Sequence, residues 1–79
     1  MADKLLDRVL SGQSDASIDF DQLCRLLGQL GFLERTRGSH HIFTKTGMLE
    51  RINLQKDGRH AKPYQVAQVR GIIVKYELA

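Results

Sequence analysis

Residues 33–55 read LERTRGSHHIFTKTGMLERINLQ, in which short runs of strand-forming residues alternate with turn residues. Three runs are visible: Leu33 to Arg37, His41 to Lys45 and Glu50 to Gln55. They are separated by Gly38-Ser39 and by Thr46-Gly47. Apolar, β-branched and aromatic residues bounded by such turns are typical of β-hairpins. The pattern predicts a three-stranded antiparallel meander.

Side chains alternate between the two faces of a strand, so apolar positions predict which face is buried. Two pairs are expected to face the core: Ile52 with Leu54, and Ile42 with Thr44. On the second strand this leaves His41, Phe43 and Lys45 on the open face. His40 is then expected on the core side, because neighbouring residues of a strand point in opposite directions.

Two helices are predicted before the meander. Leu5, Leu6, Val9 and Leu10 recur at helical spacing before Ser11-Gly12, which predicts a helix over residues 3–11, and residues 13–17 read as a polar connector. Asp19 precedes a second apolar stripe and has Gln22 three positions on, the arrangement of a capping box. Gly31 is expected to end this helix, over residues 20–30, in a left-handed conformation.

A third helix is predicted to begin at Pro63, because the first helical turn does not use the amide hydrogen that proline lacks. Val66, Val69, Ile73 and Tyr76 form its apolar stripe. Gly71 costs about 1 kcal/mol of helix propensity relative to alanine, which indicates close packing there. The order helix, helix, three strands, helix predicts an α+β fold. Helices should cover one face of the three-stranded antiparallel sheet and leave the other partly open.

Length and composition predict a single domain in an ordinary globular class. A 79-residue chain with 42% hydrophobic and 27% charged residues buries only about 60% of its surface, so no cofactor is expected. The single cysteine, Cys24, cannot form an internal disulfide and reads as a buried thiol or, alternatively, a reactive one. No apolar run reaches the roughly 20 residues of a membrane span, and no signal peptide precedes Asp3 and Lys4. A cytoplasmic protein is expected.

Positive charge is concentrated in the segment that contains the histidines. Residues 35–62 hold seven basic and two acidic residues, whereas residues 1–34 hold three basic and six acidic ones. Such a local excess attracts polyanions, of which nucleic acid is the commonest in the cytosol. The alternative is a solvated basic hairpin with no partner.

Several fragments together resemble the HicA (YcfA-like) toxins of bacterial type II toxin–antitoxin modules. They are Ile18-x-Phe20-x-x-Leu23, Leu30-Gly31-Phe32, Arg37-Gly38-Ser39-His40-His41, Ile52-Asn53-Leu54-Gln55, Ala61-Lys62-Pro63-Tyr64-Gln65-Val66 and Val69-Arg70. Their order and spacing extend the resemblance over residues 18–78. It implies one domain over residues 1–79, in which a HicA-like core, residues 18–79, follows an N-terminal helix and connector, residues 1–17.

The resemblance implies an α-β-β-β-α core similar to the double-stranded RNA-binding domain, and a ribosome-independent endoribonuclease that cleaves mRNA. It assigns the functional histidine to the last position of Gly-Ser-x-His, which is His41, and places His40 in the variable position. His40 itself is interpreted as a structural residue. It also implies a HicB-like antitoxin protein as the partner that covers His41 and the basic strands.

The expected chemistry is metal-independent cleavage by a general base. Histidine has an unperturbed pKa of about 6.5, so His41 can take the proton of a ribose 2′-hydroxyl, help worth roughly 10²–10⁴-fold in rate. The candidates to hold the phosphate or the RNA are Arg37, Gly38, Ser39, Lys45, Lys56 and Lys62. His60 is either the general acid for the leaving oxygen or a solvated loop residue.

Metal and nucleotide chemistry are not expected, because the sequence has no Cys-x-x-Cys pair, no histidine pair at helical spacing and no Gly-rich phosphate loop with its lysine. The main alternative is a non-catalytic RNA-binding module that uses the same basic face. Only Phe43 and Tyr64 are available near that face to stack on bases. A third possibility is a protein that chiefly binds an acidic protein partner.

Overall fold

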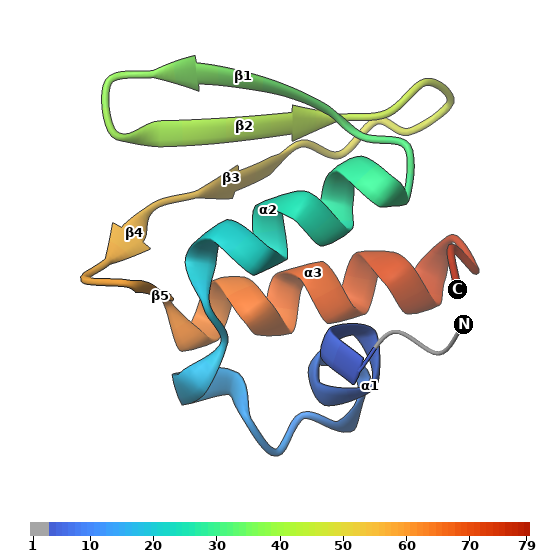
Figure 1. Cartoon of the computed structure of the whole chain (residues 1–79). Coiled ribbons are helices and arrows are strands. Elements are labelled where there is room, and N and C mark those ends of the chain that lie inside the picture. The colour runs from blue at the N-terminus through green and yellow to red at the C-terminus, as the bar shows by residue number, and fades with distance from the viewer. Residues whose placement is uncertain (1–3) are drawn as a thin grey trace.

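The computed structural model describes residues 4–79 and shows an α+β fold (Figure 1). Its elements, in chain order, are α1 (Lys4–Ser11), the short 3-10 helix η1 (Asp15–Ser17), α2 (Phe20–Gln29), β1 (Leu33–Arg37), β2 (His40–Thr44), β3 (Ile52–Leu54), β4 (Lys56–Asp57), β5 (His60–Ala61) and α3 (Pro63–Lys75). Strands β1, β2 and β3 form an antiparallel sheet, with β2 in the middle. Helices α2 and α3 lie against one face of this sheet, and α1 lies farther from it, beyond α3.

Local capping chemistry explains where α2 begins and ends. The Asp19 carboxylate accepts a hydrogen bond from the Gln22 amide at 2.9 Å, which confirms the predicted N-cap. At the other end Gly31 has a φ of +98°, its amide donates to the Gly28 carbonyl, and the Phe32 amide donates to the Leu27 carbonyl. These two bonds form a Schellman motif, and the buried side chains of Leu27 and Phe32 join the core.

The sheet register is set by the two-residue turn at Gly38-Ser39. Arg37 pairs with His40 on either side of the turn, and Gly38 has a φ of +57°. A glycine at the first central position suits the two-residue turns that match the twist of a hairpin. Along the same ladder His41 pairs with Leu54, and Phe43 pairs with Ile52.

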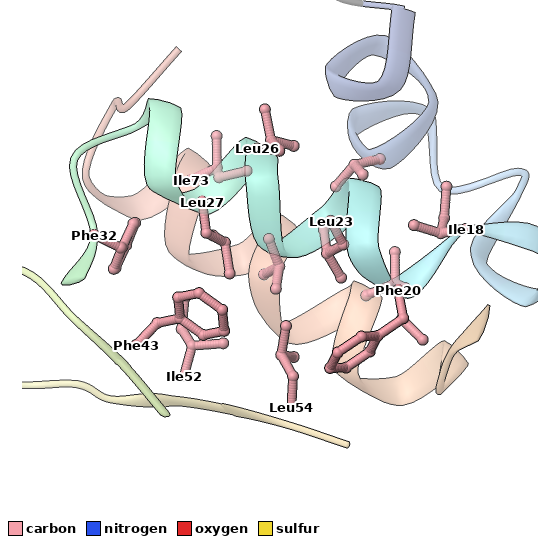
Figure 2. Packing of buried hydrophobic residues seen from close by; sticks show 14 residues of the cluster. Ile18, Phe20, Leu23, Leu26, Leu27, Phe32, Phe43, Ile52, Leu54 and Ile73 are labelled. Carbon is pink, nitrogen blue, oxygen red and sulfur yellow. The ribbon is translucent and has the colours of Figure 1, made fainter. Parts of the chain in front are cut away.

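The predicted faces of β2 are wrong by one residue. Phe43 is 1% exposed and points toward the helices beside Ile52, as Figure 2 shows. His41 therefore shares the helix-covered face with Phe43, whereas His40, Ile42 and Thr44 lie on the open face. The physical reason is that Ile42 and Phe43 are adjacent apolar residues, and burial of the larger aromatic side chain removes more apolar area from water. The inward prediction for Ile52 and Leu54 is confirmed.

Helix α3 starts at Pro63 and buries Val66, Val69 and Ile73, as the sequence predicts. Close packing at Gly71 is not found, since a methyl group there would meet no atom within 4 Å. In α1, Val9 is fully buried and tethers the helix to the core. The predicted N-terminal helix matches α1 from residue 4, and its residue 3 lies outside the described residues.

A second, two-stranded hairpin formed by β4 and β5 is missing from the sequence-based prediction, although Asp57-Gly58 is a turn signal and Gly58 has a φ of +64°. It is held by backbone hydrogen bonds to the chain that leads into α2: the Phe20 amide donates to the Arg59 carbonyl at 3.0 Å, and the Ala61 amide donates to the Ile18 carbonyl at 2.9 Å. The polar connector likewise contains the 3-10 turn η1. The hydrogen bonds of Ile18 and Phe20 hold residues 59–61, which lie between β3 and α3, beside the start of α2.

Candidate functional site

The open face of the sheet carries three arginines from its two edge regions. The register places Arg35 opposite Ile42 and Arg37 opposite His40, and Arg51 comes just before β3. A shallow groove of about 540 Å³ is lined by Arg35, Thr36, Arg37, Ile42, Thr44 and Arg51. Among residues 4–79, none of the three guanidinium groups has an acidic partner within 4 Å. Their charge is therefore available to an anionic ligand.

His40 lies on this open face within a connected polar group, the His40 cluster, which comprises Ser39, His40, Asn53, Gln55 and Lys62. The Nδ1 atom of His40 is 3.1 Å from Asn53 Oδ1, and Nε2 is 3.4 Å from Gln55 Nε2. The Gln55 amide also donates to Ser39 Oγ at 3.3 Å and accepts from Lys62 Nζ at 3.3 Å. These contacts fit a neutral imidazole that donates through Nδ1 and accepts through Nε2.

Residues in the first turn of α3 contact this cluster. The Gln65 side chain is buried; its Oε1 accepts a hydrogen bond from the backbone N–H of Gln55 at 3.1 Å, and its Nε2 donates to the Tyr64 hydroxyl at 3.3 Å. A second groove, of about 250 Å³, is lined by His40, Asn53, Gln55, Tyr64, Gln65 and Gln68. Asn53, Gln55 and Gln65 are absent from the predicted site, although the inward prediction for Ile52 and Leu54 implies, by alternation, that Asn53 and Gln55 point outward.

His41 occupies a different environment, on the helix-covered side of β2. Its Nδ1 is 2.7 Å from Glu34 Oε2, and its ring meets the Phe20 ring edge-on with centroids 4.9 Å apart. Only 27% of its side chain is exposed. A carboxylate partner fixes the orientation and tautomer of an imidazole, but it also repels a phosphate.

Cys24 on α2 lies beside this histidine. Burial raises the pKa of its thiol to about 12, with further increases from Glu34 and Asp21 and a smaller opposing effect from Lys56. The thiol is thus protonated at neutral pH, and the protonated form is the unreactive one. Of the two sequence interpretations, the geometry favours the buried thiol.

The remaining predicted residues fall into two groups. Arg37, Gly38, Ser39 and Lys62 lie at the end of the β1-β2 hairpin or within the His40 cluster. The structure places the others elsewhere: Lys45 Nζ donates to the Leu30 carbonyl, Lys56 Nζ is 3.5 Å from Asp21 Oδ1, and His60 pairs with Asp57 in the second hairpin. The fold therefore brings about half of the predicted supporting residues together around His40.

Comparison of the chain with protein-family models, with curated proteins and with solved structures found no match. In the part of the chain that the structure describes, no helix is both long and apolar enough to cross a membrane. The fold and the contrasting surroundings of the two histidines are the basis for a functional proposal.

Proposed function

We propose that this protein is a HicA-like toxin, a cytoplasmic endoribonuclease that binds mRNA on the open face of its sheet and cleaves it with His40 as the general base. The observation that carries the proposal is the position of His40. It lies on the same face as Arg35, Arg37 and Arg51, with its Nε2 positioned as a hydrogen-bond acceptor.

Electrostatics favours the open face as the RNA-binding surface. Phosphate contacts from arginine and lysine provide most of the affinity of sequence-independent nucleic-acid binding. Arg35, Arg37 and Arg51 line one groove, Arg37 pairs with His40 across the hairpin turn, and Lys62 belongs to the His40 cluster. A backbone that follows the arginines would bring a phosphate beside the imidazole.

The chemistry requires groups of the chain, the RNA and one water molecule. The ribose 2′-hydroxyl replaces the Gln55 side-chain amide at His40 Nε2, which takes the hydroxyl proton. The freed oxygen attacks the adjacent phosphorus, and the bond from phosphorus to the 5′-oxygen breaks. The leaving oxygen takes a proton from water, and the product is a 2′,3′-cyclic phosphate. The positive charges of Arg37 and Lys62 stabilise the negative charge that develops on the phosphoryl oxygens.

His41, which the resemblance implies as the catalytic residue, stays a prediction for the same experiment to test. Its place on the open face was the physical support for that role, and the register removes this support. The Glu34 carboxylate beside it also disfavours an approaching phosphate. His40 therefore has the stronger geometric claim.

The proposal includes a protein partner. A toxin must be held inactive, and the arginines of the open face are complementary to an acidic surface. We expect a HicB-like antitoxin to cover His40 and the three arginines, and so to block RNA by occupying its binding surface.

The test is cleavage of RNA by the purified protein in EDTA. The parent is expected to produce fragments that end in 2′,3′-cyclic phosphate, His40→Ala to cut at least about 100-fold more slowly, and His41→Ala, the matched control, to retain activity. Circular dichroism checks that both variants fold. Loss of activity in His41→Ala alone would transfer the role to His41, and RNA that is bound but left intact would identify a non-catalytic RNA-binding module.

A further inference from the structure

A group of side chains that can bind a metal ion lies on the opposite side of the sheet from His40. Cys24 on α2, Glu34 on β1 and His41 on β2 each offer one ligand atom, and these atoms all lie within 4.8 Å of one another. The three residues come from three different elements, and the proposed cleavage reaction uses none of them.

The donor set is that of a zinc site. Thiolate, imidazole and carboxylate are the usual zinc ligands, at about 2.3, 2.0–2.1 and 2.0–2.2 Å respectively. Ligand atoms around a tetrahedral zinc ion are therefore roughly 3.3–3.8 Å apart. The ligand atoms lie within 4.8 Å of one another, so the widest spacing has to contract by no more than about 1.5 Å, whereas His41 Nδ1 and Glu34 Oε2, at 2.7 Å, have to move apart slightly. Rotations of a half-buried cysteine and an edge-strand glutamate can supply both changes.

The charged groups around the site are of both signs. Asp21 and Arg25 line a cavity of about 540 Å³ together with Cys24 and Glu34, and Lys56 Nζ lies 3.5 Å from Asp21 Oδ1. A water molecule would reach the fourth position through this cavity. The hydrogen bond between His41 Nδ1 and Glu34 Oε2 brings two of the three side chains together in the metal-free protein, and it breaks when the ion takes the lone pairs of these two atoms.

We propose that Cys24, Glu34 and His41 bind one zinc ion, with water as the fourth ligand. Binding releases the thiol proton of Cys24 to solvent, because the thiolate is the ligand form. The ion joins α2 to β1 and β2, so it stabilises the fold from the face opposite His40. Local spacing rules could not indicate this site, because the ligands are ten and seven residues apart in the sequence.

The experiment is titration of the full-length protein with cobalt(II), a spectroscopic substitute for zinc, followed by competition with zinc(II). The parent is expected to bind one equivalent, with a charge-transfer band from cobalt to a thiolate and visible bands of tetrahedral intensity. Zinc should abolish these bands and raise the thermal unfolding midpoint. The absence of a thiolate band, or a midpoint unaffected by zinc in excess, would overturn the proposal.

Single substitutions then identify the ligands. Cys24→Ser should lose the charge-transfer band, and Glu34→Gln and His41→Gln should each weaken cobalt binding by at least about tenfold. His60→Gln is the matched control, since His60 is half-buried but outside the group, and should bind as the parent does. Unchanged affinity in Glu34→Gln or His41→Gln would refute the three-ligand site. Because zinc is not required for RNA cleavage in EDTA, failure of either proposal leaves the other intact.

Discussion

Arg70 on α3 forms a two-point ion pair with Asp15 in η1, although the two residues are 55 positions apart in the sequence. The Nη1 to Oδ1 distance is 2.9 Å and the Nη2 to Oδ2 distance is 3.1 Å, and Nη1 also donates to the Val9 carbonyl at 3.0 Å. One guanidinium group thus joins α1, η1 and α3. Helices α1 and η1 are therefore integral parts of the fold rather than appendages.

Replacement of Arg70 should therefore destabilise the whole domain. Arg70→Ala is expected to lower the free energy of unfolding by about 1.5–3 kcal/mol, because the pair is largely shielded from solvent and hydrogen bonds to charged groups are the stronger ones. Arg70→Lys should restore only part of the lost free energy of unfolding, since lysine lacks the planar guanidinium group that makes two parallel hydrogen bonds to a carboxylate. Urea unfolding measures both, and Arg51→Ala on the open face should stay within about 0.5 kcal/mol of the parent. Equal stability of Arg70→Ala and Arg51→Ala would contradict the role of the ion pair.

The faces of β2 can be checked by paired substitutions. Phe43→Ala is expected to cost about 3–5 kcal/mol and Ile42→Ala less than about 1.5 kcal/mol, because only Phe43 is fully buried. Phe43→Leu provides a milder variant if Phe43→Ala does not fold. Thermal unfolding followed by circular dichroism ranks them. A larger loss in Ile42→Ala would restore the face assignment that the sequence alone predicts.

The contacts of Glu50 with the C-terminal end of α3 should make a pH-dependent contribution to the free energy of unfolding. Hydrogen bonds from Lys75, whose Nζ lies 2.5 Å from Oε2, and from the Tyr76 hydroxyl lower the Glu50 pKa from 4.5 to about 2. The folded-state pKa is below the unfolded value, so this stabilisation is present above about pH 4.5 and disappears as the pH falls toward 2.

Glu50→Gln should accordingly unfold at a lower denaturant concentration than the parent above about pH 5, and the two should converge as the pH falls from 4.5 to 2. Denaturant midpoints along a pH series measure the difference. Asp57→Asn in the second hairpin serves as the control and should track the parent throughout. A gap between parent and Glu50→Gln that stays constant down to pH 2 would rule out the proposed cause.

The arginines of the open face predict how RNA binding responds to salt, provided that the proposed function holds. Arg35→Gln, Arg37→Gln and Arg51→Gln should each reduce the slope of log affinity against log salt by about 1, the loss expected for one phosphate contact. Fluorescence anisotropy with a labelled RNA measures the slope. Arg25→Gln on α2 should leave the slope unchanged. If the three open-face variants had the same slope as Arg25→Gln, RNA would not bind on the open face of the sheet.

The helix boundaries were predictable because they depend on neighbouring residues. Asp19 caps α2 through an amide three positions on, Gly31 adopts the left-handed conformation that ends it, and Pro63 opens α3. Each of these effects involves residues within about one helical turn of one another, so the interacting residues are also neighbours in the sequence. The three-strand order follows in the same way from the turns at Gly38 and Gly47.

The features that were missed depend on distant parts of the chain. The orientation of β2 rests on which of Ile42 and Phe43 fits the space between the sheet and the helices, and the alternation pattern is compatible with both. The second hairpin exists because Ile18 and Phe20 supply backbone partners for residues 59–61. Cys24, Glu34 and His41 meet only once α2, β1 and β2 have packed together.

The pleat of β2 has a consequence for how this protein can change. His40 and His41 share a peptide bond, yet one faces the arginine-lined surface and the other faces Phe20 and Glu34. A substitution at either position leaves the surroundings of the other almost untouched. The proposed chemistry on one side of the strand and the proposed metal site on the other can therefore change independently, although two consecutive codons encode both histidines.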